Sequence, residues 1–104
     1  MNAPPVVLTL VASRLLEDKL VELLLAHELA GAAGFTVREV VAYGRNVEFR
    51  TTGEQISGRV RQIEIRAVLA PDAARAIVRD LGGAVIGQRV AWLISPVEEA
   101  GVSL

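Results

Sequence analysis

Two segments of the chain alternate apolar and polar residues in the way that is typical of half-buried β-strands. Residues 35–43 begin after Gly34 and end before Gly44, and residues 60–69 form the second segment. Successive side chains of a strand point to opposite faces of a sheet, so the second segment has one apolar and one polar face. The apolar face carries Ile63, Ile65, Ala67 and Leu69, and the polar face carries Gln62, Glu64 and Arg66.

Two further strands are expected near the ends of the chain. Residues 6–12 are an apolar run rich in β-branched side chains, which is typical of a buried strand. Residues 89–95 contain Trp92 and form the last expected strand, which Pro96 ends.

The first helix is expected over residues 14–28. Leucines recur there at spacings of three and four, so that they line one face of a helix. Ser13 is the expected N-terminal cap, and Gly31 and Gly34 are expected to end the helix.

The second helix is expected to begin at Pro71, which suits a first helical turn, and to close at Gly82 and Gly83. The order of elements is then β-α-β-β-α-β within a single domain, residues 1–104. This order predicts an α+β, ferredoxin-like fold, an antiparallel sheet with two helices on one face. Residues 45–58 are polar and are expected to form a flexible loop between the second and third strands.

The composition fits one folded domain and excludes several functional classes. Hydrophobic residues make up 52% of the 104 residues, and the net charge of −1 gives no general attraction to nucleic acid or to an anionic membrane. The absence of cysteine excludes disulfides, redox thiols and thiolate metal sites. Because no signal peptide and no membrane-spanning apolar run is recognisable, a soluble cytoplasmic protein is expected.

Few groups suit catalysis or metal binding. His27 is the only histidine, and with only Glu28 beside it we expect a helix-end residue instead of a metal ligand. Glu39 and Glu64 are a candidate carboxylate pair, but no nucleophile or base accompanies them. We therefore expect no catalytic residue, no metal and no required cofactor, and the chain is not expected to be an enzyme. Trp92 is expected in the core or in a subunit interface.

The sheet has a second face that two helices cannot cover. Glu39, Glu64 and Arg66 are expected on this face, among valine and alanine side chains. A face that mixes apolar and oppositely charged residues is either solvated or in contact with other subunits, so self-association through it is one expectation.

Four short segments, spread over almost the whole chain, carry a family resemblance: residues 16–20, 34–40, 62–65 and 96–100. In this order they resemble the early helix, the second strand, the third strand and the end of the fourth strand of the PII-like signalling proteins. Gly44 and Arg45 are similar to the start of the T-loop of that family. PII-like proteins are trimers of ferredoxin-like subunits that bind effectors in the clefts between neighbours. The resemblance therefore implies a homotrimer with a regulatory role.

Residues 53–61, which read Gly-Glu-Gln-Ile-Ser-Gly-Arg-Val-Arg, carry a finer resemblance. Together with the short C-terminus, they are similar to a PII-like subgroup of poorly defined function that is often encoded beside heavy-metal efflux pumps. This resemblance implies a partner that is a membrane transporter or the regulator of one.

The region before the last strand departs from the nitrogen-signalling members of the family. Those members hold ATP phosphates with a Gly-Asp-Gly-Lys loop, whereas residues 84–89 here read Ala-Val-Ile-Gly-Gln-Arg. Either Arg89 or Ala91 takes the place of the lysine, depending on the motif that anchors the alignment. The segment 45–58 lacks the tyrosine that is uridylylated in those members, so this modification is not expected.

A third branch of the family supplies an alternative. Residues 44–47 and Arg50 resemble the loop of the carbon-sensing PII-like proteins, which bind adenine nucleotides. An adenine nucleotide is therefore a candidate effector, and the alternative function is a carbon or bicarbonate sensor. A structural assembly trimer without an effector is a further alternative.

The candidate effector site follows from the resemblance and from the basic residues. Only one of the eleven basic residues, Lys19, is lysine, so arginine side chains and backbone N–H groups are the expected ligands of an anion. We expect a small anionic ligand, bound in the cleft between subunits by Gly44, Arg45, Glu64, Gly87 and Arg89. Gly82, Gly83 and Gly87 are candidates for a loop whose backbone N–H groups hold a phosphate, and a helix end followed by a turn is the alternative interpretation.

The loop and its borders are expected to contact the partner protein. Long loops in compact domains are usually functional, and this one is rich in arginine. The partner-binding residues are expected to be Arg50, Glu54 and Arg59. A solvated hairpin without a partner is the alternative.

Overall fold

The computed structural model describes residues 3–44 and 59–104, so the predictions for the segment 45–58, including Arg45, Arg50 and Glu54, lie outside the described residues. Two edge strands, two inner strands and the helical segments make up the described part. In chain order these are β1 (Val6–Ser13), one turn of 3₁₀-helix (Arg14–Leu16), α1 (Glu17–Ala26), α2 (Glu28–Ala33), β2 (Thr36–Ala42), β3 (Val60–Leu69), α4 (Pro71–Ala84) and β4 (Val90–Pro96).

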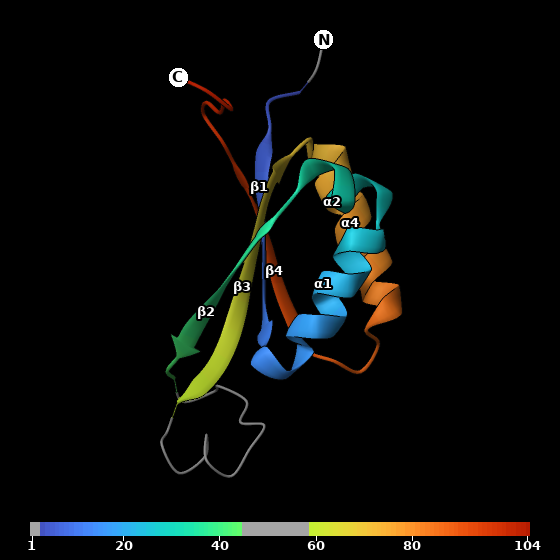
Figure 1. The fold of residues 1–104 in the computed structure, drawn as a ribbon, viewed down its shortest axis with the longest axis vertical. Coiled ribbons are helices and arrows are strands. Elements are labelled where there is room, and N and C mark those ends of the chain that lie inside the picture. Colours follow the sequence, from blue (N-terminus) through green and yellow to red (C-terminus); the bar gives the residue numbers. More distant parts are fainter. Residues whose placement is uncertain (1–2, 45–58) are drawn as a thin grey trace.

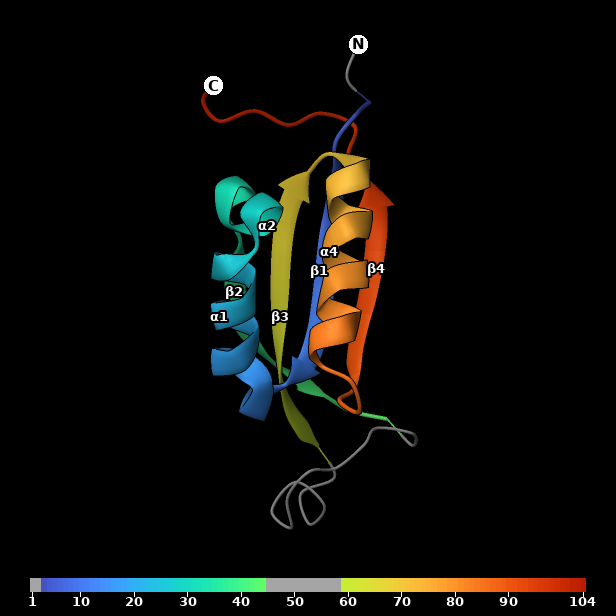
Figure 2. The same cartoon turned by 90° about the vertical axis from the view of Figure 1, so that its right-hand side faces the viewer.

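The four strands form one antiparallel sheet in the order β2-β3-β1-β4. Strands β1 and β3 lie inside the sheet, and β2 and β4 form its two edges. The helices cover one face of the sheet, as Figures 1 and 2 show from two directions. The predicted α+β, ferredoxin-like arrangement is thus confirmed.

The core lies between the sheet and the helices. Leu20 of α1, Ile63 of β3 and Ile77 of α4 are fully buried at its centre. Ile63, Ile65 and Leu69 share this buried face of β3, as the alternation of the sequence predicts. No helix within the described residues is long and apolar enough to cross a membrane.

The first predicted helix is interrupted. Residues 14–28 were expected to be continuous, but the backbone of His27 is extended (φ −75°, ψ 126°) and separates α1 from α2. The imidazole Nδ1 of His27 accepts hydrogen bonds from the N–H groups of Leu29 and Ala30, so the ring caps α2. The spacing of the leucines does not reveal this break, because the side chain of His27 replaces the hydrogen bonds that the interrupted helix would lose.

Gly31 is predicted to end the helix, but it lies inside α2. A Cβ atom at this position would lie 2.7 Å from the carbonyl oxygen of Leu25, so α2 approaches the backbone of α1 closely. Gly34 does end α2, with the positive φ of 77° that favours glycine.

Gly82 and Gly83 also lie inside a helix, although they were expected to close it. The helix α4 continues to Ala84, and Val85 caps its end. Leu81 and Val85 are both buried in the core. Their packing outweighs the poor helix propensity of the two glycines. Each glycine destabilises a helix by about 1 kcal/mol relative to alanine.

We expect one substitution to have opposite effects at two of these glycines. A Cβ atom at Gly83 would meet no atom within 4 Å beyond its chain neighbours and the backbone of its own helix, so Gly83→Ala is expected to stabilise the protein by about 0.4–1 kcal/mol. Gly31→Ala is expected to destabilise it by about 1 kcal/mol, because strain against Leu25 exceeds the gain in helix propensity. Thermal unfolding of both variants measures the difference, and equal shifts would contradict the close approach of α2 to α1.

Glu39 does not lie on the predicted face of the sheet. The strand register pairs Glu39 with Ile63 and pairs Arg38 with Glu64. Directly opposed residues share a face, so Glu39 lies on the helix side, where its carboxylate is 3.8 Å from the guanidinium of Arg14. Glu39 and Glu64 are therefore on opposite faces, and the candidate carboxylate pair is wrong.

Candidate functional site

The face of the sheet that turns away from the helices is called the outer sheet face here. The strand register places on it Thr36, Arg38 and Val40 of β2, Gln62, Glu64, Arg66 and Val68 of β3, Val7, Thr9 and Val11 of β1, and Ala91, Leu93 and Ser95 of β4. Apolar side chains therefore run across its middle, and Leu93 is 53% exposed. No helix covers this face within the described residues (Figure 1).

Glu64, a predicted effector ligand, lies on the outer sheet face in an ion pair. Its Oε1 atom is 3.1 Å from Nε and 3.0 Å from Nη2 of Arg38. The carboxylate is partly buried, whereas Arg38 is exposed. Because Arg38 neutralises this carboxylate, the pair sits on an apolar face without adding net charge to it.

The other described candidates lie at two corners of the sheet. Glu39 of β2, Ile63 of β3, Ala12 of β1 and Val90 of β4 form one row of paired residues across the sheet. The two edge strands run in opposite directions, so the end of β2 and the start of β4 both lie near this row. The corner after β2 contains Gly44, and the corner before β4 contains Gly87 and Arg89.

Both corners are therefore at the same end of the sheet but on opposite edges, as Figure 1 shows. Within one chain the structure does not bring Gly44 together with Gly87 and Arg89. Gly87 has a φ of 83°, which favours glycine, and Arg89 is exposed. Arg59, the described member of the predicted partner-binding set, is exposed directly before β3.

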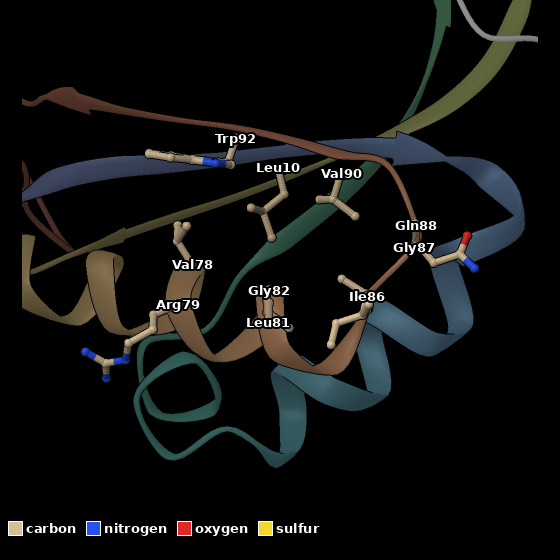
Figure 3. A pocket seen from close by; sticks show the side chains of 11 residues that line it. Leu10, Val78, Arg79, Leu81, Gly82, Ile86, Gly87, Gln88, Val90 and Trp92 are labelled. Atoms are coloured by element: carbon tan, nitrogen blue, oxygen red, sulfur yellow. The ribbon is translucent and has the colours of Figure 1, made fainter.

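A cavity of about 390 Å³ lies beside the second corner, between α4 and the edge strand β4. Leu10, Val78 and Val90 point into it in Figure 3, and Trp92 forms one wall. Gly87 and Gln88 lie at its end. Trp92 is 57% exposed and so is not part of the core of the single chain.

The sequence pattern does not reveal this cavity. The alternation in β4 places Val90, Trp92 and Ile94 on one face, which is a signal for a strand that turns apolar residues towards a helix. It does not show that α4 leaves part of that face open. Among residues 3–44 and 59–104, no group of three His, Asp or Glu side chains is placed to hold a metal ion.

Solved structures share this fold. A DUF3240 family protein from Shewanella baltica is 16% identical, with a TM-score of 0.76 over 98% of this chain and 99% of that chain. A protein from Thermus thermophilus, described as a candidate PII-like signaling protein, is 22% identical, with a TM-score of 0.58 over 93% of this chain and 91% of that chain. A Bacillus cereus protein related to NIF3 is 16% identical, with a TM-score of 0.59 over 95% of this chain and 27% of that chain.

These likenesses show that the chain has the PII-like fold that the sequence resemblance implied. No curated protein matches the sequence. The family model described as a protein of unknown function, DUF3240, matches residues 2–104, and the chain therefore belongs to the DUF3240 family.

Proposed function

We propose that this protein is a PII-like regulator that acts by binding and not by catalysis. It forms a homotrimer, senses a small anionic effector in the clefts between subunits, and modulates a membrane transport system through its loop. The observation that carries the proposal is that both glycine-containing corners lie at the same end of the sheet, on opposite edges.

The outer sheet face supports self-association. It presents Val11, Val68 and Leu93 around the neutral Arg38–Glu64 pair, which is the composition of a surface suited to burial. In the proposed ring, the β2 edge of one subunit lies beside the β4 edge of the next, a head-to-tail contact that closes under rotational symmetry. This arrangement gives each cleft one corner from each of two neighbours.

The chemistry of the two corners supports an anionic effector. Gly87 allows a ligand to approach the backbone closely, and Arg89 of the same corner supplies an exposed guanidinium. Gly44 of the neighbouring subunit completes the cleft, with Arg45 directly after it in the sequence. Most residues that line the cavity beside Gly87 are apolar, which also suits the ring of an adenine nucleotide. A carbon or bicarbonate sensor is therefore the second candidate function.

A ligand screen tests the proposal. Adenine nucleotides, inorganic phosphate, bicarbonate and divalent metals are added in turn, and a compound that binds only the native state raises the melting temperature. Trp92 is the only tryptophan and lines the cavity beside Gly87, so its fluorescence reports binding near this corner. A trimer for which no compound changes either signal would support the structural assembly trimer.

Arg89→Ala is expected to weaken binding of the compound so identified by about ten- to a hundredfold, equal to about 1.5–3 kcal/mol, because a charged hydrogen bond is lost. Arg45→Ala is expected to act in the same way. Calorimetric titration gives the dissociation constants. Arg75→Ala is the matched control, since Arg75 lies on the exposed side of α4 with only a 4.0 Å contact to Asp72. Unchanged binding by both Arg45→Ala and Arg89→Ala would exclude the cleft as the site.

A further inference from the structure

His27 connects three helices, since its backbone ends α1 and its imidazole ring contacts α2 and α4. Its backbone forms the break between α1 and α2, and its Nδ1 atom lies 3.2 Å from the backbone nitrogen of Leu29 and 3.4 Å from that of Ala30. Its Nε2 atom lies 2.9 Å from Oδ2 of Asp80 on α4, a residue 53 positions away in the sequence. The ring therefore joins the start of α2 to the neighbouring helix.

These contacts determine the protonation state of the ring. Leu29 and Ala30 contribute N–H donors, so Nδ1 must act as an acceptor and carry no proton. Asp80 contributes a carboxylate oxygen, so Nε2 must donate. The arrangement requires the neutral tautomer with its proton on Nε2. A doubly protonated ring could still donate to Asp80 but could no longer cap α2.

The charged surroundings of the ring come mainly from α4. Asp80 is the acid in contact with it, and Nε of Arg79 lies 3.4 Å from Oδ1 of the same carboxylate. The hydrogen bond from His27, followed by the contact with Arg79, lowers the pKa of Asp80. Glu28 is adjacent in the chain, and within the described residues no other charged side chain forms an ion pair with the ring. The lowered pKa keeps Asp80 ionised over the pH range in which histidine side chains commonly change charge.

We propose that His27 is a proton-sensitive joint, in which the neutral ring caps α2 and the protonated ring keeps its bond to Asp80 but releases the first turn of α2. Histidine is the side chain that commonly changes charge between about pH 5 and 8, so the transition is sought in that range. The helix α2 leads through Gly34 into β2, the edge strand that ends at Gly44. Protonation therefore loosens the helical support at the beginning of the strand whose other end contributes to the proposed cleft.

Nuclear magnetic resonance of the full chain tests this joint. At pH 8, the ¹⁵N shifts of the ring are expected to show a proton on Nε2 and none on Nδ1. On acidification through the transition, the protection factors of the Leu29 and Ala30 amides are expected to fall by about two- to thirtyfold, as for the loss of a helix cap. Protection factors correct for the dependence of intrinsic exchange on pH, and core amides such as that of Ile63 serve as an internal reference.

His27→Asn is the matched variant, because asparagine also caps helices but does not titrate in this range. Its Leu29 and Ala30 amides are expected to keep the same protection factors from pH 5 to 8. A proton on Nδ1 in the wild type at pH 8 would overturn the proposal without any variant. The same pH-dependent step in His27→Asn, or no step in the wild type as its ring becomes protonated, would overturn it as well.

Discussion

Leu93→Asp is expected to convert the proposed trimer into monomers without unfolding the chain. Leu93 is on the outer sheet face and is 53% exposed in the single chain, so an aspartate there remains solvated in the monomer. In a trimer that buries this face, each subunit would bring one unpaired carboxylate out of water, at a cost of several kcal/mol. Light scattering at micromolar concentration measures the mass, and circular dichroism checks that the fold is retained.

Leu25→Asp is the control for this experiment. Leu25 lies on α1, on the helix side of the sheet, and its exposure of 64% is close to that of Leu93. The same chemical change there is expected to leave the trimer intact. A wild-type monomer, or a Leu93→Asp variant that keeps the wild-type mass, would show that the outer sheet face is not the interface.

Assembly and effector binding are expected to depend on each other. The two corners of the proposed cleft lie on opposite edges of one sheet, so a single chain cannot close the cleft. Leu93→Asp should therefore weaken effector binding even though Leu93 is on neither corner. Arg89→Ala, in contrast, should weaken binding while the mass stays that of the trimer. This contrast separates a site between subunits from a site within one chain.

The strands could be predicted from the sequence almost to the residue. The bounds of β3 agree with the expected residues 60–69, whereas β1 differs by one residue at one end and β2 and β4 differ by one residue at both ends. Alternation is informative here because one face of each strand meets the core. The face of an individual residue on an edge strand was harder to predict. Both faces of β2 carry exposed side chains, and Glu39 was consequently placed on the wrong one.

The helical layer was less predictable because it depends on distant contacts. The break at His27 is stabilised by Asp80, which is 53 residues away, and no local pattern links the two positions. Gly82 and Gly83 look like a helix end, yet tertiary packing of Leu81 and Val85 carries the helix past them. The same limit applies to the candidate site. The sequence suggested Gly44, Gly87 and Arg89, but only the strand order shows that they occupy opposite edges at one end.

Ile77→Ala is expected to destabilise the protein by about 2–5 kcal/mol. Ile77 is fully buried where α4 meets the sheet, so the substitution removes apolar contacts and leaves a cavity. The loss is a large part of the roughly 5–15 kcal/mol that usually stabilises a domain. Ile86→Ala is the matched control, because Ile86 is 83% exposed and the same change should cost less than about 0.5 kcal/mol. Urea denaturation measures both values, and a similar loss for the two variants would contradict the placement of the core.

The dependence of unfolding on protein concentration distinguishes a core defect from an assembly defect. A trimer that dissociates on unfolding has a melting temperature that rises with concentration, by mass action. Ile77→Ala is expected to lower the melting temperature at every concentration and to keep this dependence, since the outer sheet face is unchanged. Leu93→Asp is expected to abolish the dependence, since its chains unfold as monomers. If Ile77→Ala alone removed the dependence, the helical layer, and not the outer sheet face, would hold the subunits together.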